Sequence, residues 1–187
     1  MSALASLLPR FGRRSRHERP GFLLYGAAVA AARRPELYGT FEVPDTLDGR
    51  FDLIGLYAWL VIHRVRFLPD PGPDLAQAVF DAMFSDMDVA LREMGVGDLS
   101  VGKRVRAMWE AFHGRALAYE QALVTGDPAG LREALIRNIW RGTPPRDGAA
   151  DALARLTRAQ HDHLARQDAS ALFQGRIDFL PPDGVAP

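Results

Sequence analysis

The stretch FSDMDVALREMGVGDLSVGKRVRAMWEAFHGRALAYEQAL, residues 84–123, predicts two amphipathic helices joined by a short turn that contains glycine. Apolar side chains before the turn recur at helical spacing, which predicts a helix over residues 74–94 with Met87 and Met94 in its buried stripe. Gly95 stands where this helix must end, because glycine readily adopts the positive φ of a helix C-terminus. The stripe of the second helix consists of Val101, Val105, Met108, Phe112, Ala116, Tyr119 and Leu123.

The turn also imitates a nucleotide-binding motif. Residues 97–103, GDLSVGK, fit the first seven positions of a phosphate-binding P-loop, but Arg104 occupies the position of the hydroxyl that holds Mg²⁺. A P-loop also follows a strand, whereas this turn follows a predicted helix. We therefore expect a helix connection here and no bound nucleotide.

The rest of the chain completes an all-α prediction. Further helices are predicted over residues 22–32, 50–68, 129–140 and 151–166, with residues 36–47 as a loop and residues 173–187 as a strap across the bundle. No alternating β-branched run is present. We expect a single compact helical domain of about six helices over residues 21–180, a basic and disordered arm over residues 1–20, and a tail over residues 181–187.

The predicted core follows from the apolar stripes. The helix over residues 50–68 is hydrophobic nearly all round from Leu53 to Ile62, so it should be central and buried. The side chains that we expect to be buried in the core are Trp59, Met83, Phe84, Met87, Phe112 and Tyr119.

Composition restricts the function. The 187 residues are 48% hydrophobic and carry no net charge, so bulk charge gives no case for a specific nucleic-acid partner. The chain has no cysteine, which excludes disulfides and thiolate chemistry. Lys103 is the only lysine among many arginines, and this bias, with abundant Ala, Gly and Pro, is typical of a GC-rich bacterial genome. The arginine-rich residues 1–34 carry a net charge of +6. For the basic arm over residues 1–20, an anionic membrane surface or an RNA is a candidate partner, and a disordered tail without function is the alternative.

Candidate catalytic and metal-binding residues form no complete motif. Glu110 and His113 make one Glu-x-x-His, whereas a di-iron bundle needs two. His161 and His163 are two residues apart on a helix and point to different faces. His63 at the edge of an apolar helix is expected to be a packed or capping residue. We expect no catalytic residue, no metal and no cofactor.

Several ordered motifs in the chain look like those of a known family. They are Phe84-x-Asp86-Met87-Asp88, Arg92-Glu93-Met94-Gly95-Val96-Gly97-Asp98, Val101-x-Lys103, Phe112-His113-Gly114-Arg115 with Ala118-Tyr119, and Leu135-x-Arg137-Asn138. Further matching motifs lie upstream: Arg33-x-Pro35, Val43-Pro44-Asp45-Thr46, Gly49-Arg50-Phe51 and Trp59-Leu60. Over about residues 24–140 the chain resembles bacterial members of the ubiquinol–cytochrome c chaperone family.

The resemblance implies an all-helical protein that is not an enzyme. Mitochondrial members help to assemble the cytochrome bc1 complex, act with a small partner protein near the ribosome, and hold newly made cytochrome b. For this chain it implies a chaperone for cytochrome b or another new membrane subunit, located in the cytoplasm or peripherally at the inner face of the membrane. Two alternatives stay open: a helical bundle that encloses a quinone or haem, with His63 or His113 as an iron ligand, and a general adaptor or scaffold protein.

Charged and polar residues around the turn are the candidates for binding a client or an assembly partner. Acids precede the turn and bases follow it, so the two helices can pair along their rims if they are antiparallel. Such pairs either only stabilise the hairpin or also hold a partner. The candidates are Asp86, Asp88, Arg92, Asp98, Lys103, Arg115, Arg137 and Asn138.

Overall fold

The computed structural model describes residues 17–146 and 148–185, and the side chains of Asp98, Leu99 and Val185 lie outside this description. The described residues form helices and connecting segments, with no strand among them. The helices are α1 (Glu18–Ala32), α2 (Pro35–Gly39), α3 (Leu47–Arg66), α4 (Gly72–Glu93), α5 (Asp98–Val124), α6 (Pro128–Ile139), α7 (Ala149–Ala165), α8 (Ala169–Phe173) and a final 3₁₀ turn, η2 (Pro182–Val185).

The all-α prediction is confirmed, and the six predicted helices correspond to α1 and α3–α7. The prediction missed α2 and α8, which have five residues each and are too short to show a helical period. Helix α2 lies mostly within the segment predicted as a loop, so that part of the prediction is wrong. Helix α1 begins at Glu18, inside the predicted arm; residues 1–16 of the arm lie outside the described residues.

Helix α3 is the central element, as its apolar sequence predicts. The Thr46 hydroxyl oxygen caps its first turn by accepting a hydrogen bond from the Gly49 amide at 3.1 Å. The side chains of α3 are buried against α1, α4 and α7, and Trp59 packs its ring 5.4 Å from that of Tyr119 on α5. Helix α1 approaches α4 so closely that a Cβ added to Gly21 would lie 2.7 Å from the Cβ of Ala78.

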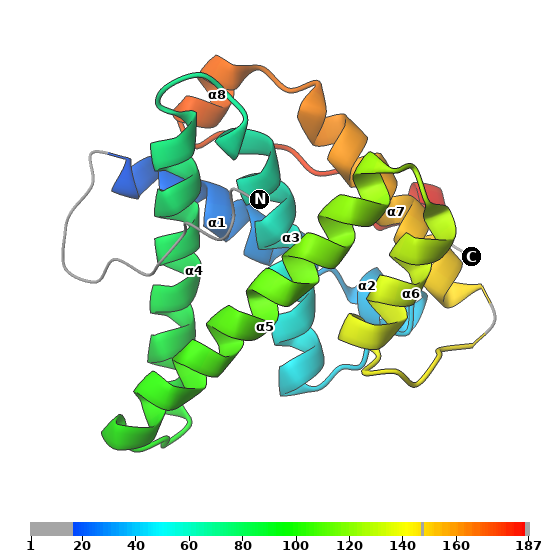
Figure 1. Ribbon diagram of the computed structural model, residues 1–187, viewed down its shortest axis with the longest axis horizontal. Helices are drawn as coiled ribbons and strands as arrows, with labels where there is room; N and C mark the ends of the chain where they lie inside the picture. The colour runs from blue at the N-terminus through cyan, green and yellow to red at the C-terminus, as the bar shows by residue number, and fades with distance from the viewer. Residues whose placement is uncertain (1–16, 147, 186–187) are drawn as a thin grey trace.

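The α4–α5 hairpin forms as the sequence predicts at its turn. Gly95 has a φ of +79°, and the amide of Val96 donates to the Leu91 carbonyl, which closes the end of α4. From this turn α5 runs obliquely away from α4 toward α6 and α7 (Figure 1). The two helices are therefore close near the turn and separate farther along.

The predicted core is confirmed for the side chains expected to be buried: Trp59, Met83, Phe84, Met87, Phe112 and Tyr119. Met94 is wrongly predicted, because its side chain is 43% exposed at the end of α4. Gly114 lies on the exposed surface of α5, with no atom within 4 Å of an added Cβ.

The C-terminal segment crosses the bundle as a strap, as predicted. The side-chain amide of Gln160 on α7 donates to the Leu180 carbonyl at 2.8 Å and accepts from the Leu180 amide at 2.9 Å. Phe179 packs its ring 5.4 Å from that of Tyr57 on α3. The strap therefore covers one side of the central helix.

Candidate functional site: an apolar groove between α3, α4, α5 and α6

A groove of about 540 Å³ opens where the first half of α3, the end of α4, the first half of α5 and the end of α6 come together. It exists because α5 diverges from α4 after the turn at Gly95 (Figure 1). Residues from the first half of α3 line the space between the diverging helices and leave it open. The groove is thus a consequence of the helix arrangement.

The bed of the groove is apolar and contains flexible side chains. Met87, Leu91 and Phe112 lie buried beneath it, while Met94 and Leu47 are exposed at its rim. Methionine is unbranched and polarizable, so it adapts to surfaces of different shape. An exposed apolar surface of this kind is typical of sites that bind another apolar chain.

Gly55 leaves the centre of the groove open. It lies on α3 and lines the groove, and a Cβ added there meets no atom within 4 Å. A helical glycine is less stable than alanine by about 1 kcal/mol. The space beside Gly55 is therefore free for part of a ligand.

Arginines border the groove on two sides. Arg104 and Arg115 come from α5, Arg137 comes from α6, and Arg141 lies in the turn just after α6. Four arginines against two aspartates give the groove lining a net charge of +2.

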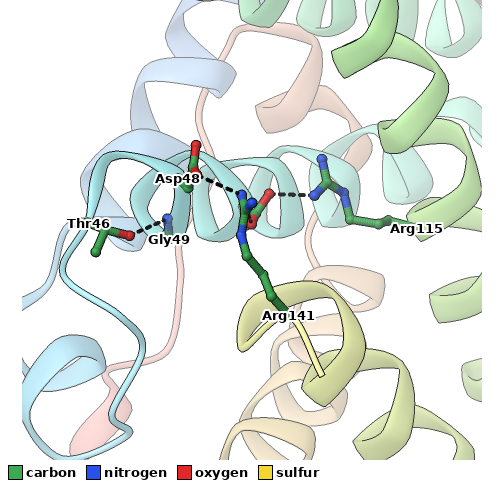
Figure 2. A network of polar contacts seen from close by, with 6 residues as sticks. Thr46, Asp48, Gly49, Arg115 and Arg141 are labelled. Atoms are coloured by element: carbon green, nitrogen blue, oxygen red, sulfur yellow. Dashed lines mark hydrogen bonds and ion pairs between the residues drawn. The ribbon is translucent and has the colours of Figure 1, made fainter. Parts of the chain in front are cut away.

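Two of these arginines are held by acids of α3. Arg115 forms an ion pair with Asp52, and Arg141 approaches Asp52 at 3.2 Å and Asp48 at 3.3 Å. Figure 2 shows Arg115 and Arg141 pointing toward α3 from different sides. Burial raises the pKa of the Asp52 carboxyl above its ordinary value, and the two guanidinium groups oppose that shift.

The other two arginines, Arg104 and Arg137, have no ion-pair partner within residues 17–146 and 148–185, and both side chains belong to exposed residues. They are the groups in the groove that a negatively charged ligand can reach most easily.

The structure places three of the predicted site residues in this groove: Arg115, Arg137 and Asn138. The other described candidates lie outside its lining. Lys103 is exposed on α5, and Asp88 pairs with Arg92 one turn along α4 at 2.7 Å.

The predicted pairing of α4 acids with α5 bases is wrong for Asp86 and Arg115. Asp86 accepts a hydrogen bond from the Tyr25 hydroxyl of α1 at 2.6 Å, and Arg115 pairs with α3. Burial and the bond to Asp86 raise the pKa of Tyr25. These charges connect the hairpin to α1 and α3, because α5 diverges from α4.

The groove residues that sequence reasoning missed include Asp52, Gly55, Arg104 and Arg141. A usable signal was present for Asp52, which is an acid within an otherwise apolar helix and needs a buried partner. Arg104 was considered only as the residue that breaks the P-loop pattern. Nothing local distinguishes Gly55 or Arg141.

The histidines lie outside the groove lining. His63 is 8% exposed and packs against the rings of Trp59, Phe67 and His161, and burial lowers its pKa to about 4. The His113 Nδ1 atom lies 2.9 Å from the Trp109 carbonyl oxygen. Within the described residues no three His, Cys, Asp or Glu side chains gather as metal ligands would.

The described part of the chain contains no helix that combines the length and the apolar character needed to cross a membrane.

An all-helical domain whose site is an open apolar groove bordered by arginines has the chemistry of a binding protein. The sequence profile described as "Ubiquinol-cytochrome C chaperone" matches residues 39–179. The chain therefore belongs to the ubiquinol–cytochrome c chaperone family, a family of assembly chaperones and not of enzymes.

The similarity of the chain to named proteins is consistent with its membership of this family. The chain is 23% identical over 159 residues to ubiquinol-cytochrome-c reductase complex assembly factor 1 of Xenopus laevis, covering 84% of this chain and 79% of that protein. It is 26% identical to the mitochondrial protein CBP3 of Saccharomyces cerevisiae, covering 78% of this chain and 44% of the yeast protein. The chain spans 54% of the mouse assembly factor 1.

A solved structure has the same fold. The crystal structure of the Cbp3 homolog from Brucella abortus superposes with a TM-score of 0.81 and 35% sequence identity, covering 90% of this chain and 93% of that one.

Proposed function

We propose that this protein is an assembly chaperone of the cytochrome bc1 complex and that its groove holds an apolar segment of newly made cytochrome b. The observation that carries the proposal is the open, methionine-containing groove between α3, α4, α5 and α6 in a member of this chaperone family. The relatives named as complex assembly factors support the bc1 complex as the destination.

The groove has the properties that such a client requires. A membrane subunit that is not yet assembled exposes apolar helices, which must be covered in water. Met87 and Met108 in the groove, with Met94 at its rim, can adapt to client side chains of different shapes, and Gly55 provides a space for one of them. The chaperone acts at the inner face of the membrane, where a nascent apolar segment first needs cover.

The test is to fill the groove without disturbing the fold. Gly55→Leu places an apolar side chain in open space, and Gly102→Leu is the matched control, because Gly102 is an exposed helical glycine on α5 with equal space. Both variants should fold at least as stably as the wild type, since leucine is the better helix former by about 0.8 kcal/mol.

Each variant replaces the wild-type protein in its native host. Co-purification of cytochrome b in mild detergent and the haem spectrum of cytochrome b in membranes are then measured. We expect Gly55→Leu to lower both signals and Gly102→Leu to lower neither. Normal assembly with Gly55→Leu contradicts the groove as the client site. Co-purification of another bc1 subunit instead of cytochrome b would show that this subunit is the client.

A further inference from the structure

The groove carries a charge pattern that its apolar bed does not require. Arg104 lies on α5 and Arg137 lies on α6, so they reach the groove from two different helices. Neither has an ion-pair partner among the described residues, whereas Arg115 and Arg141 are both bound to Asp52. The apolar bed therefore lies between two cations that are free to bind a ligand.

The size of the groove suits a helix. Its α5 wall runs from Arg104 to Arg115, which at 1.5 Å per residue is about 16 Å, or three helical turns. An apolar stripe laid into a groove of this kind is a common way for an amphipathic helix to bind.

From these two observations we infer that the groove selects a helical protein segment with an apolar face flanked by acidic side chains, which Arg104 and Arg137 bind. Charges at the edge of an interface set the register and the choice of partner more than they add affinity. This inference rests on the proposed function and specifies the kind of segment that the groove accepts.

A flat anionic membrane surface fits the same cations less well. The two arginines come from two different helices that line a groove, not from one flat face. The intervening bed is recessed and apolar, so it favours a protruding helix over a plane of headgroups.

The test uses three synthetic helical peptides of about 18 residues, long enough to form a helix. All carry the same leucine face, and the two positions that flank it are glutamate, glutamine or lysine. Binding to the purified full chain is measured by fluorescence anisotropy at low and at high salt. We expect the glutamate peptide to bind about tenfold more tightly than the glutamine peptide at low salt, and the lysine peptide to bind most weakly.

Variants of the protein test whether the two arginines cause the preference for the glutamate peptide. The double variant Arg104→Gln, Arg137→Gln should bind the glutamate and glutamine peptides equally. Arg106→Gln is the control, because Arg106 lies on the same helix outside the groove lining and should retain the preference. Gly55→Leu should weaken the binding of all three peptides.

Three results overturn the inference. The first is equal binding of the three peptides. The second is a glutamate preference that survives in the double variant. The third is that no peptide shows binding that Gly55→Leu weakens. Binding of phosphatidylglycerol vesicles that depends on both arginines, without a peptide preference, also overturns it and assigns the cations to a lipid surface. The proposed function is tested separately, because it fails only if cytochrome b assembly is normal with Gly55→Leu.

Discussion

Replacing Phe112 by alanine tests whether the wall of the groove is also part of the core. Phe112 is 4% exposed, and its ring lies 5.8 Å from that of Phe80 and 6.3 Å from that of Phe84, both in edge-on arrangements. Core Phe→Ala substitutions cost about 3–5 kcal/mol, including the cavity that they leave. Because Phe112 also borders the groove, neighbouring side chains can relax into the space, so we expect a loss near ~3 kcal/mol.

The loss is measured as the change in free energy of unfolding from urea titrations followed by circular dichroism. For a chain of this size it corresponds to a fall of about 6–12 °C in Tm. Leu117→Ala is the control, because Leu117 is exposed on the same helix and its truncation should change stability by less than about 0.5 kcal/mol. Equal effects of the two substitutions would refute the packing of Phe112 against Phe80 and Phe84.

Two further predictions concern α3. Gly55→Ala should stabilise the protein by about 1 kcal/mol in thermal unfolding, because the added Cβ meets open space. Gly49→Ala should destabilise it, because the added Cβ would collide with a backbone carbonyl of the preceding loop. Burial lowers the pKa of His63 to about 4, so the unfolded chain takes up the proton first as the pH falls. Stability should therefore be full above about pH 6.5 and decline by up to about 3 kcal/mol toward pH 4. His63→Leu should remove this part of the pH dependence, and an unchanged curve would contradict the assignment.

The long helices could be predicted because each carries its own periodic stripe and a recognisable end. Gly95 is the clearest case, since its position alone indicated a positive φ and the end of α4. Helices α2 and α8 could not be predicted, because five residues hold little more than one turn and their stability comes from packing.

The groove was only partly predictable. The sequence indicated Arg115, Arg137 and Asn138 as candidates, but it assigned Arg115 to the wrong partner. The actual partner, Asp52, is far away along the chain, and periodicity states which face of a helix is buried but not which helix covers it. Met94 was placed in the core because its spacing is helical, but its side chain is 43% exposed at the end of α4, and spacing alone does not show whether another helix covers that point.

The strap has a consequence for the order in which the protein folds during synthesis. Phe179 packs on Tyr57, and Gln160 is joined to Leu180 through both of its side-chain amide atoms, so the central helix gains part of its cover from residues made well after it. At about 5–20 residues per second, the ribosome needs several seconds to make the chain between these partners. During that interval α3 is without the strap, and its exposed apolar side chains can associate with other chains. A chaperone with this topology is therefore itself open to misassembly until the strap has been made and has docked.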